Sequence, residues 1–98
     1  MHEYYRLKKA VAKVLSNFGF TESIPDTETD GCGSIFCMYV SAGKRFIIEW
    51  DGEEGFGLVQ SWQGGTDWQA LEPIVPESTE LELQRNISAL CAEVRRQL

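Results

Sequence analysis

The sequence predicts one α+β domain, residues 1–98, with an antiparallel β-meander of three to four strands between an N-terminal and a C-terminal helix. Two patterns carry this prediction. Apolar residues recur at helical spacing near both ends of the chain, and short glycine-bounded segments between them are typical of strands. The order is α-β-β-β-(β)-α, with both helices packed on one face of the sheet. The other face should then carry partly exposed side chains such as Trp50 or Trp62.

Residues 3–18 are the first predicted helix, because their apolar residues share one helical face. These residues are Tyr4, Leu7, Val11, Val14, Leu15 and Phe18. Gly19 follows and is free to take the left-handed conformation that ends many helices. The last predicted helix covers residues 79–98, where Thr79 and Glu82 have the spacing of a capping box.

Between the helices, residues 21–33 are polar and end in Asp-Gly-Cys-Gly, which predicts a loop and a turn. Three strands are predicted next, at Ser34–Val40, Arg45–Trp50 and Phe56–Trp62. Short glycine-bearing connections join them, so they should pair as an antiparallel meander. Residues 67–72 form either a short fourth strand or an irregular edge.

The charge of the chain is concentrated in its middle. The net charge is −6 and the isoelectric point is near 4.7. Residues 21–80 carry twelve acidic and two basic side chains, a net of −10, whereas residues 1–20 carry a net of +3. This balance argues against nucleic acid or an anionic membrane as the partner and favours a basic protein.

Three cysteines, Cys32, Cys37 and Cys91, form an odd set without repeated spacing. A secreted disulfide-bonded domain of this length carries a denser, even set, so reduced thiols in a cytoplasmic protein are expected. The first residues also lack the charged and then apolar run of a signal peptide. We therefore expect a cytoplasmic protein, monomeric or homodimeric.

The sequence offers little for catalysis or for a cofactor. His2 is its single histidine and adjoins a terminus expected to be mobile, so it is a poor general base. Zinc would need all of Cys32, Cys37, Cys91 and His2, and although four residues separate Cys32 from Cys37, the sequence has no second pair with the spacing of a zinc site. The segment 26–31 partly resembles a calcium loop, but Cys37 stands where the pattern needs a bidentate glutamate. We expect no enzymatic activity, no metal and no cofactor.

Acidic and aromatic residues are interleaved between residues 46 and 72. Tryptophan supplies much of the binding energy at protein interfaces, and surrounding charges steer the partner. The alternative is that the tryptophans belong to the core, although large rings are rarely all fully covered in so small a domain. The predicted partner-binding residues are Glu49, Trp50, Asp51, Glu53, Glu54, Trp62, Asp67 and Trp68.

The stretch Phe46–Gln60, followed by Trp62-Gln63-Gly64-Gly65 and Trp68, resembles the small acidic immunity proteins of bacterial polymorphic-toxin and contact-dependent inhibition systems. Those proteins are short, cytoplasmic and commonly α+β, and each caps a cognate toxin that is often a basic nuclease. The resemblance implies that acidic and aromatic side chains block the active site or substrate groove of a toxin.

A second resemblance is to type III secretion chaperones, which are also small and acidic. They too place an amphipathic helix, here Tyr4–Phe18, ahead of a meander, and they end in a helix that often forms a dimer. This alternative implies an adaptor that holds an extended segment of an effector and dimerises through residues 79–98.

Overall fold

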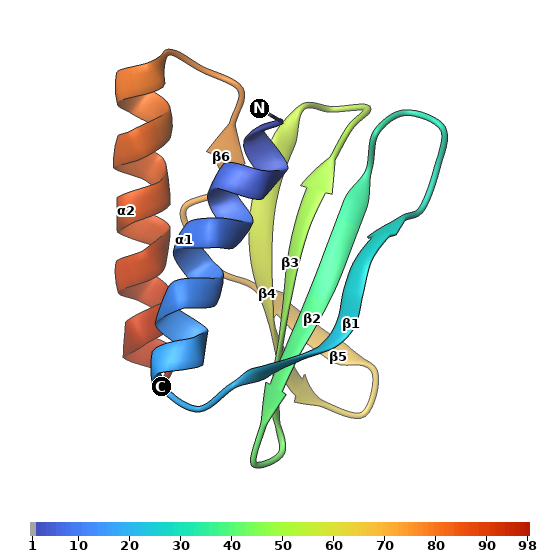
Figure 1. Ribbon diagram of the computed structural model, residues 1–98, viewed down its shortest axis with the longest axis vertical. Coiled ribbons are helices and arrows are strands. Elements are labelled where there is room, and N and C mark those ends of the chain that lie inside the picture. The colour runs from blue at the N-terminus through green and yellow to red at the C-terminus, as the bar shows by residue number, and fades with distance from the viewer. Residues whose placement is uncertain (1) are drawn as a thin grey trace.

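The computed structural model describes residues 2–98, which form two helices and one six-stranded sheet (Figure 1). The helices are α1 (Glu3–Asn17) and α2 (Glu80–Gln97), and the strands are β1 (Thr21–Glu28), β2 (Ile35–Ser41), β3 (Lys44–Asp51), β4 (Phe56–Gly64), β5 (Asp67–Ala70) and β6 (Val75–Pro76). The predicted α+β class, the antiparallel meander and the two terminal helices are confirmed, and the meander has five strands where three to four were expected.

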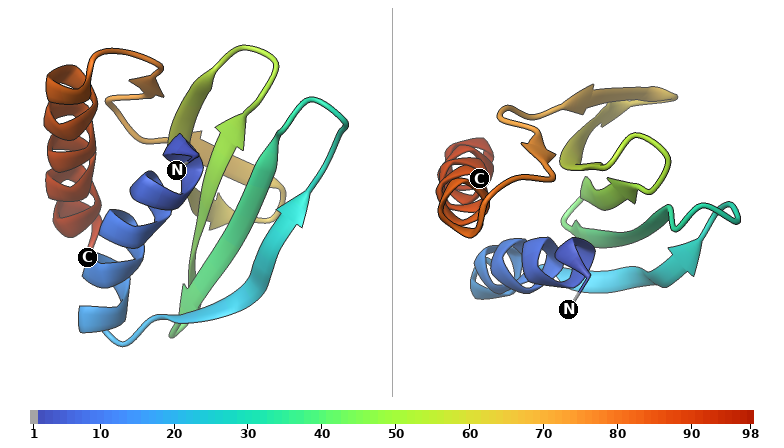
Figure 2. Two further views of the ribbon diagram at one scale, coloured as in Figure 1. Left: turned by 45° about the horizontal axis from the view of Figure 1, so that its top comes forward. Right: turned by 90° about the horizontal axis from the view of Figure 1, so that it is seen from above.

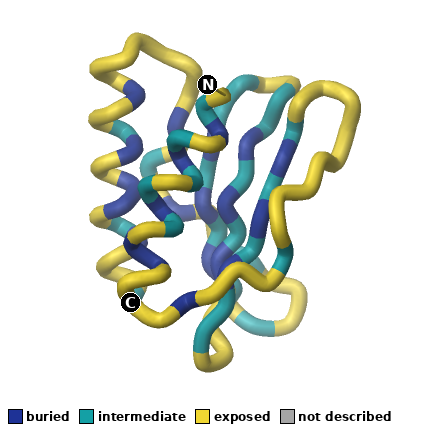
Figure 3. The backbone as a smooth tube through the Cα atoms, in the orientation of Figure 1, coloured by how far each residue is buried: buried dark blue, intermediate teal, exposed yellow. Residues whose placement is uncertain are grey.

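Strands β1 to β5 are antiparallel neighbours in chain order, and β6 pairs with the beginning of β4. The prediction of a loop over residues 21–33 is therefore wrong for Thr21–Glu28. This strand is polar, interrupted by Pro25 and shifted twice in its register with β2. Such features are common at a sheet edge, where they discourage pairing with other chains. Figure 3 shows β1 exposed along nearly all of its length.

The core lies between α1 and one face of β2, β3 and β4. The buried residues of α1 are Tyr4, Leu7, Val11, Val14 and Leu15, as the helical spacing predicted, but Phe18, predicted on the same face, follows the helix and is exposed. Gly19 has φ +85°, which confirms its left-handed position after the helix. The strands contribute every second residue, including Cys37, Ile48 and Val59, because alternate side chains of a strand point to opposite faces.

Helix α2 lies on the same side of the sheet as α1 but farther out, beside α1 and against β6 (Figures 1 and 2). Thr79 caps it by accepting the backbone N–H of Glu82 at 3.3 Å, as the capping-box spacing predicted. Its apolar residues Leu83, Ile87, Leu90, Cys91 and Val94 are all buried within the chain. Only α1 therefore lies directly over the centre of the sheet.

Trp50 lies in the core, 2% exposed, so the expectation of a partly exposed ring is wrong for this residue. It shares the inner face of β3 with Phe46 and Ile48, and period-2 alternation puts all three beneath α1. His2 meets the Trp50 ring edge-on, with ring centroids 5.6 Å apart.

Within residues 2–98, neither helix is long and apolar enough to cross a membrane.

Candidate functional site

The face of the sheet that points away from α1 is left without a helix over it in the described chain (Figure 2). We call this surface the open face. Its central residues are Phe36, Met38, Val40, Arg45, Ile47, Glu49, Leu58, Gln60, Trp62 and Trp68. Most are half-buried, because they cover one another across the strands while their outer atoms meet solvent. A partly exposed apolar surface of this kind is typical of an interaction site.

Trp62 and Trp68 are cross-strand partners at the end of the open face where β4 turns into β5. The indole Nε1–H of Trp62 donates to the carbonyl of Gly65 at 3.0 Å, and the Arg45 guanidinium lies 4.4 Å from the Trp62 ring centroid. These contacts hold the ring in one orientation before any partner binds. A pre-oriented aromatic ring loses little conformational entropy on binding and can serve as an anchor.

The predicted acidic residues Asp51, Glu53 and Glu54 lie at the opposite end of the sheet, in the turn between β3 and β4. Asp51 has a structural role: its carboxylate accepts the backbone N–H groups of Glu53 and Glu54 at 3.0 and 2.9 Å. The side chains of Glu53 and Glu54 are exposed. They are therefore the two carboxylates of this turn that are most open to solvent.

This turn is anchored to the loop between β1 and β2. The backbone N–H of Gly52 donates to the Ser34 hydroxyl at 2.9 Å. The two backbones are so close that a Cβ on Gly52 would lie 2.1 Å from the carbonyl oxygen of Cys32. Within the β1–β2 loop, the Asp30 carboxylate accepts the backbone N–H groups of Cys32 and Ser34, and these hydrogen bonds lower the pKa of Asp30. The acidic turn is thus held in place rather than free in solvent.

The candidate residues form two groups at opposite ends of β4, as Figure 1 shows for the turns that carry them. Six residues separate Phe56 from Trp62, and a strand advances about 3.3 Å per residue, so the groups lie about 20 Å apart. Glu49 lies between them and accepts a hydrogen bond from the Gln60 amide. Asp67 is exposed at the start of β5. The open face joins the two groups into one surface.

Trp50 does not belong to this surface, because it is buried on the opposite face of the sheet. Sequence reasoning left out several residues that the structure adds to the open face, chiefly Phe36, Met38 and Val40 on β2. The sequence could have indicated them, because they alternate along β2 with the buried residues Ile35, Cys37 and Tyr39. The close approach of Gly52 to the neighbouring loop has no signature in the sequence.

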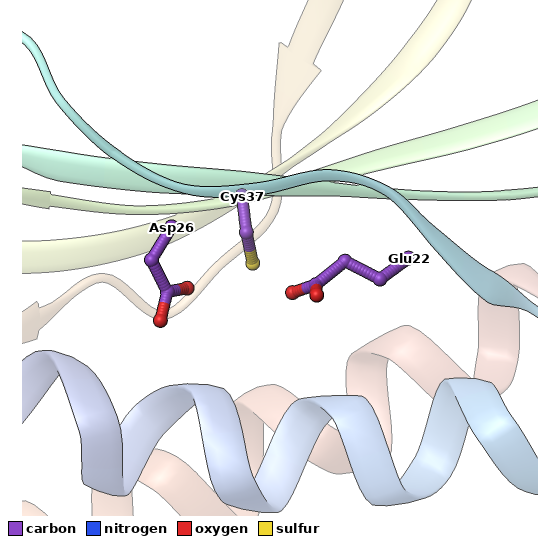
Figure 4. Close-up of side chains that lie close together, drawn as sticks. All are labelled: Glu22, Asp26 and Cys37. Atoms are coloured by element: carbon purple, nitrogen blue, oxygen red, sulfur yellow. The ribbon is translucent and has the colours of Figure 1, made fainter.

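On the helix side, a polar cluster joins α1 to β1 and β2. One carboxylate oxygen each of Glu22 and Asp26 and the Sγ atom of Cys37 all lie within 4.8 Å of one another, as potential metal ligands would (Figure 4). The Lys8 ammonium is 2.5 Å from Glu22 and 2.6 Å from Asp26, and the Tyr4 hydroxyl donates to Asp26 at 2.7 Å. Lys8 thus supplies the positive charge that a metal would bring, and the cluster fastens the edge strand β1 to α1.

The two acidic ends of the calcium-like segment have different partners. Asp26 lies on β1 and binds the Lys8 ammonium, whereas Asp30 lies in the β1–β2 loop and accepts the backbone N–H of Cys32.

His2 caps the first helix, whereas the terminal residue Met1, where mobility was expected, lies outside the described residues. The Nδ1 of His2 accepts the backbone N–H of Tyr4 at 3.0 Å. Cys37 and Cys91 are buried, as predicted for small apolar side chains, and burial raises the pKa of both thiols. Cys32 is exposed. None of these residues forms a nucleophile–base pair with another among the described residues.

Comparison of the chain with protein-family models, with curated proteins and with solved structures found no match. The resemblances to immunity proteins and to secretion chaperones therefore stay predictions.

Proposed function

We propose that this protein is a non-enzymatic, cytoplasmic immunity protein that binds a cognate basic toxin domain through the open face and blocks its active site or substrate groove. The observation that supports the proposal is the open face itself, a half-buried and largely apolar surface. The cross-strand pair of Trp62 and Trp68 lies at one end of it, and the anchored acidic turn lies at the other. This arrangement has the apolar centre and charged rim of a protein interface.

The dimensions of the surface support a protein partner. A stable interface buries about 800 Å² on each side. Four strands about 4.8 Å apart and about 20 Å long cover roughly 400 Å² in projection, so an interface of that size would also include the turns at both ends of the open face. A small-molecule ligand would instead need an enclosed, deep pocket.

The charges support a basic partner. Glu53, Glu54 and Asp67 are exposed and make no ion pair among residues 2–98. Unpaired carboxylates around an apolar surface attract a basic protein over a distance and disfavour an acidic one.

The alternative is a type III secretion chaperone or another small adaptor that binds an effector segment. A chaperone dimer through residues 79–98 would need an apolar face on α2. Five apolar residues of this helix are already buried against α1 and β6, and among the described residues of the helix Leu81 is the one large hydrophobic side chain that is exposed. This observation favours the immunity protein.

The test begins with the neighbouring gene, where we expect a large reading frame that ends in a basic toxin domain, and this domain is then co-expressed with the protein. We expect the toxin alone to stop growth, and this protein to restore growth and to co-elute with the toxin as a stoichiometric complex. Growth arrest that persists although both proteins accumulate in soluble form would contradict the proposal. Co-elution with an unfolded effector segment as a dimer would favour the chaperone.

A further inference from the structure

A second surface, on the other side of the molecule, lies between the two helices. Two adjoining hollows of about 320 and 650 Å³ share Ala10 and Lys13 and form one groove between α1 and α2. Val14, Ile87 and Cys91 form its apolar floor. We call it the interhelical groove.

The groove ends at Phe18, whose side chain is 54% exposed. A large aromatic ring left this exposed at the end of an apolar floor is a ready contact for an apolar side chain of another molecule.

Basic side chains line this groove on both helices. Lys9 and Lys13 come from α1 and Arg95 from α2, and all three are exposed. Among residues 2–98 none of them makes an ion pair, whereas Arg6 and Lys8 are paired with Glu80 and with Glu22 and Asp26. Three unpaired cations around one groove stand out in a chain with a net charge of −6.

We propose that the interhelical groove binds an acidic amphipathic helix of a protein partner, independently of the open face. An amphipathic helix lays its apolar side into a groove of this kind, while its flanking charges meet the rim. Here the apolar side would contact Val14, Ile87 and Phe18, and flanking carboxylates would pair with Lys13 and Arg95. Charge complementarity selects an acidic helix over a basic one.

The length of the groove fits this occupant. It extends along α1 from Arg6 to Asn17, a rise of eleven residues or about 17 Å at 1.5 Å per residue. That length matches a helix of about three turns. A flat bilayer would not reach the floor between two helices, and the acidic remainder of the chain would repel an anionic membrane.

The probe is a helix-stabilised synthetic peptide of about 14 residues, with leucine at positions i, i+4 and i+7 and glutamate beside them. We expect saturable binding with a Kd of about 10–100 µM, weakened by salt. Amide chemical-shift changes should concentrate on Ala10, Lys13 and Ser88. A peptide with lysine in place of glutamate should not bind.

Lys13→Glu should weaken binding of the acidic peptide about tenfold. The matched control Lys44→Glu makes the same charge reversal at the start of β3, and its affinity should stay within about twofold of that of the unmodified protein. Phe18→Ser, at an exposed position, should also weaken binding without changing the charge.

Several results would overturn the proposal. They are the absence of saturable binding, equal binding by Lys13→Glu and Lys44→Glu, and shift changes on the open face instead of the groove. If the protein binds phosphatidylserine vesicles, loses this binding in Lys13→Glu and does not bind the peptide, the groove would be a lipid site instead. Self-association that Lys13→Glu abolishes would assign it to a second copy. These measurements need no toxin, so their failure is distinct from failure of the proposed function.

Discussion

The Trp50 indole lies directly against Gly57 on the neighbouring strand. The two residues are paired in the β3–β4 ladder, and a Cβ at position 57 would come within 2.8 Å of Trp50 Cε3 and 2.7 Å of Leu7 Cδ2. The ring and the helix thus occupy the space that a side chain at position 57 would need. This contact assigns Trp50 to folding, and it leaves Trp62 and Trp68 as the tryptophans accessible to a partner.

We expect Gly57→Ala to lower the free energy of unfolding by about 1–3 kcal/mol, because the added methyl group forces α1 or the Trp50 ring to move. Trp50→Ala should cost about 3–5 kcal/mol through the cavity it leaves. Urea denaturation measures both. Gly31→Ala is the control, since no atom lies within 4 Å of a Cβ there. Equal stability of Gly57→Ala and Gly31→Ala would show that the contact is not tight.

The acidic turn depends on the close approach of Gly52 to the β1–β2 loop. Gly52→Ala should separate the two turns and lower stability by about 1–3 kcal/mol, because the added Cβ would collide with backbone atoms. Ser34→Ala removes the hydrogen bond without a clash and should cost about 0.5–1.5 kcal/mol. Hydrogen exchange of the Gly52 amide should accelerate in both variants. Unchanged protection of this amide would contradict the docked arrangement.

The buried hydroxyl of Tyr4 should make the free energy of unfolding fall at alkaline pH. Burial of its hydroxyl, aided by the neighbouring Cys37 and Asp26, raises its pKa well above the usual value of 10.0. The unfolded chain therefore releases this proton near pH 10 while the folded protein retains it, so stability is full below that pH and falls as the pH rises further.

Tyr4→Phe should lose about 0.5–1.5 kcal/mol at neutral pH with its hydrogen bond to Asp26. Its stability should then fall less steeply above pH 10. A weaker decrease of stability with pH should remain in Tyr4→Phe, because burial also raises the pKa of the Cys37 thiol. Unfolding free energies between about pH 7 and 11 provide the measurement. An alkaline slope identical to that of the unmodified protein would exclude Tyr4 as its source.

The exposed carboxylates of the turn should steer a basic partner. We expect Glu53→Gln with Glu54→Gln to slow association several-fold, and to change dissociation less, because rim charges act mainly on the encounter. The association rate of the unmodified protein should fall as salt rises. Stopped-flow measurements test both. Glu82→Gln, on α2 away from the open face, should leave the rate unchanged. A salt-independent association rate would rule out steering.

The helices and inner strands could be predicted from the sequence because their burial follows a simple period. Edge strand β1 could not, since its residues are polar and Pro25 interrupts it. What makes it a strand is its pairing with β2 and the attachment of Glu22 and Asp26 to Lys8, both long-range contacts. Local propensity does not contain such contacts.

The candidate site was predictable in part. The acidic turn and the two tryptophans Trp62 and Trp68 could be named as candidates from composition, and the structure adds that the two tryptophans are cross-strand partners. Trp50 was assigned to the same surface because its neighbours Glu49 and Asp51 are acidic, although strand alternation sets it with Phe46 and Ile48 in the core. For a residue in a strand, the face it occupies decides its role more than its neighbours in sequence do.

The most direct test of the open face is the affinity of Trp62→Ala and Trp68→Ala for the cognate toxin domain, measured by titration calorimetry together with the melting temperature of each variant. Both rings are half-buried on the sheet surface rather than in the core, so both variants should stay folded. Losing a central aromatic anchor costs about 2–4 kcal/mol, so at least one variant should bind about 30- to 1000-fold more weakly and lose protection in co-expression. Two folded variants that bind and protect like the unmodified protein would contradict the assignment of the open face.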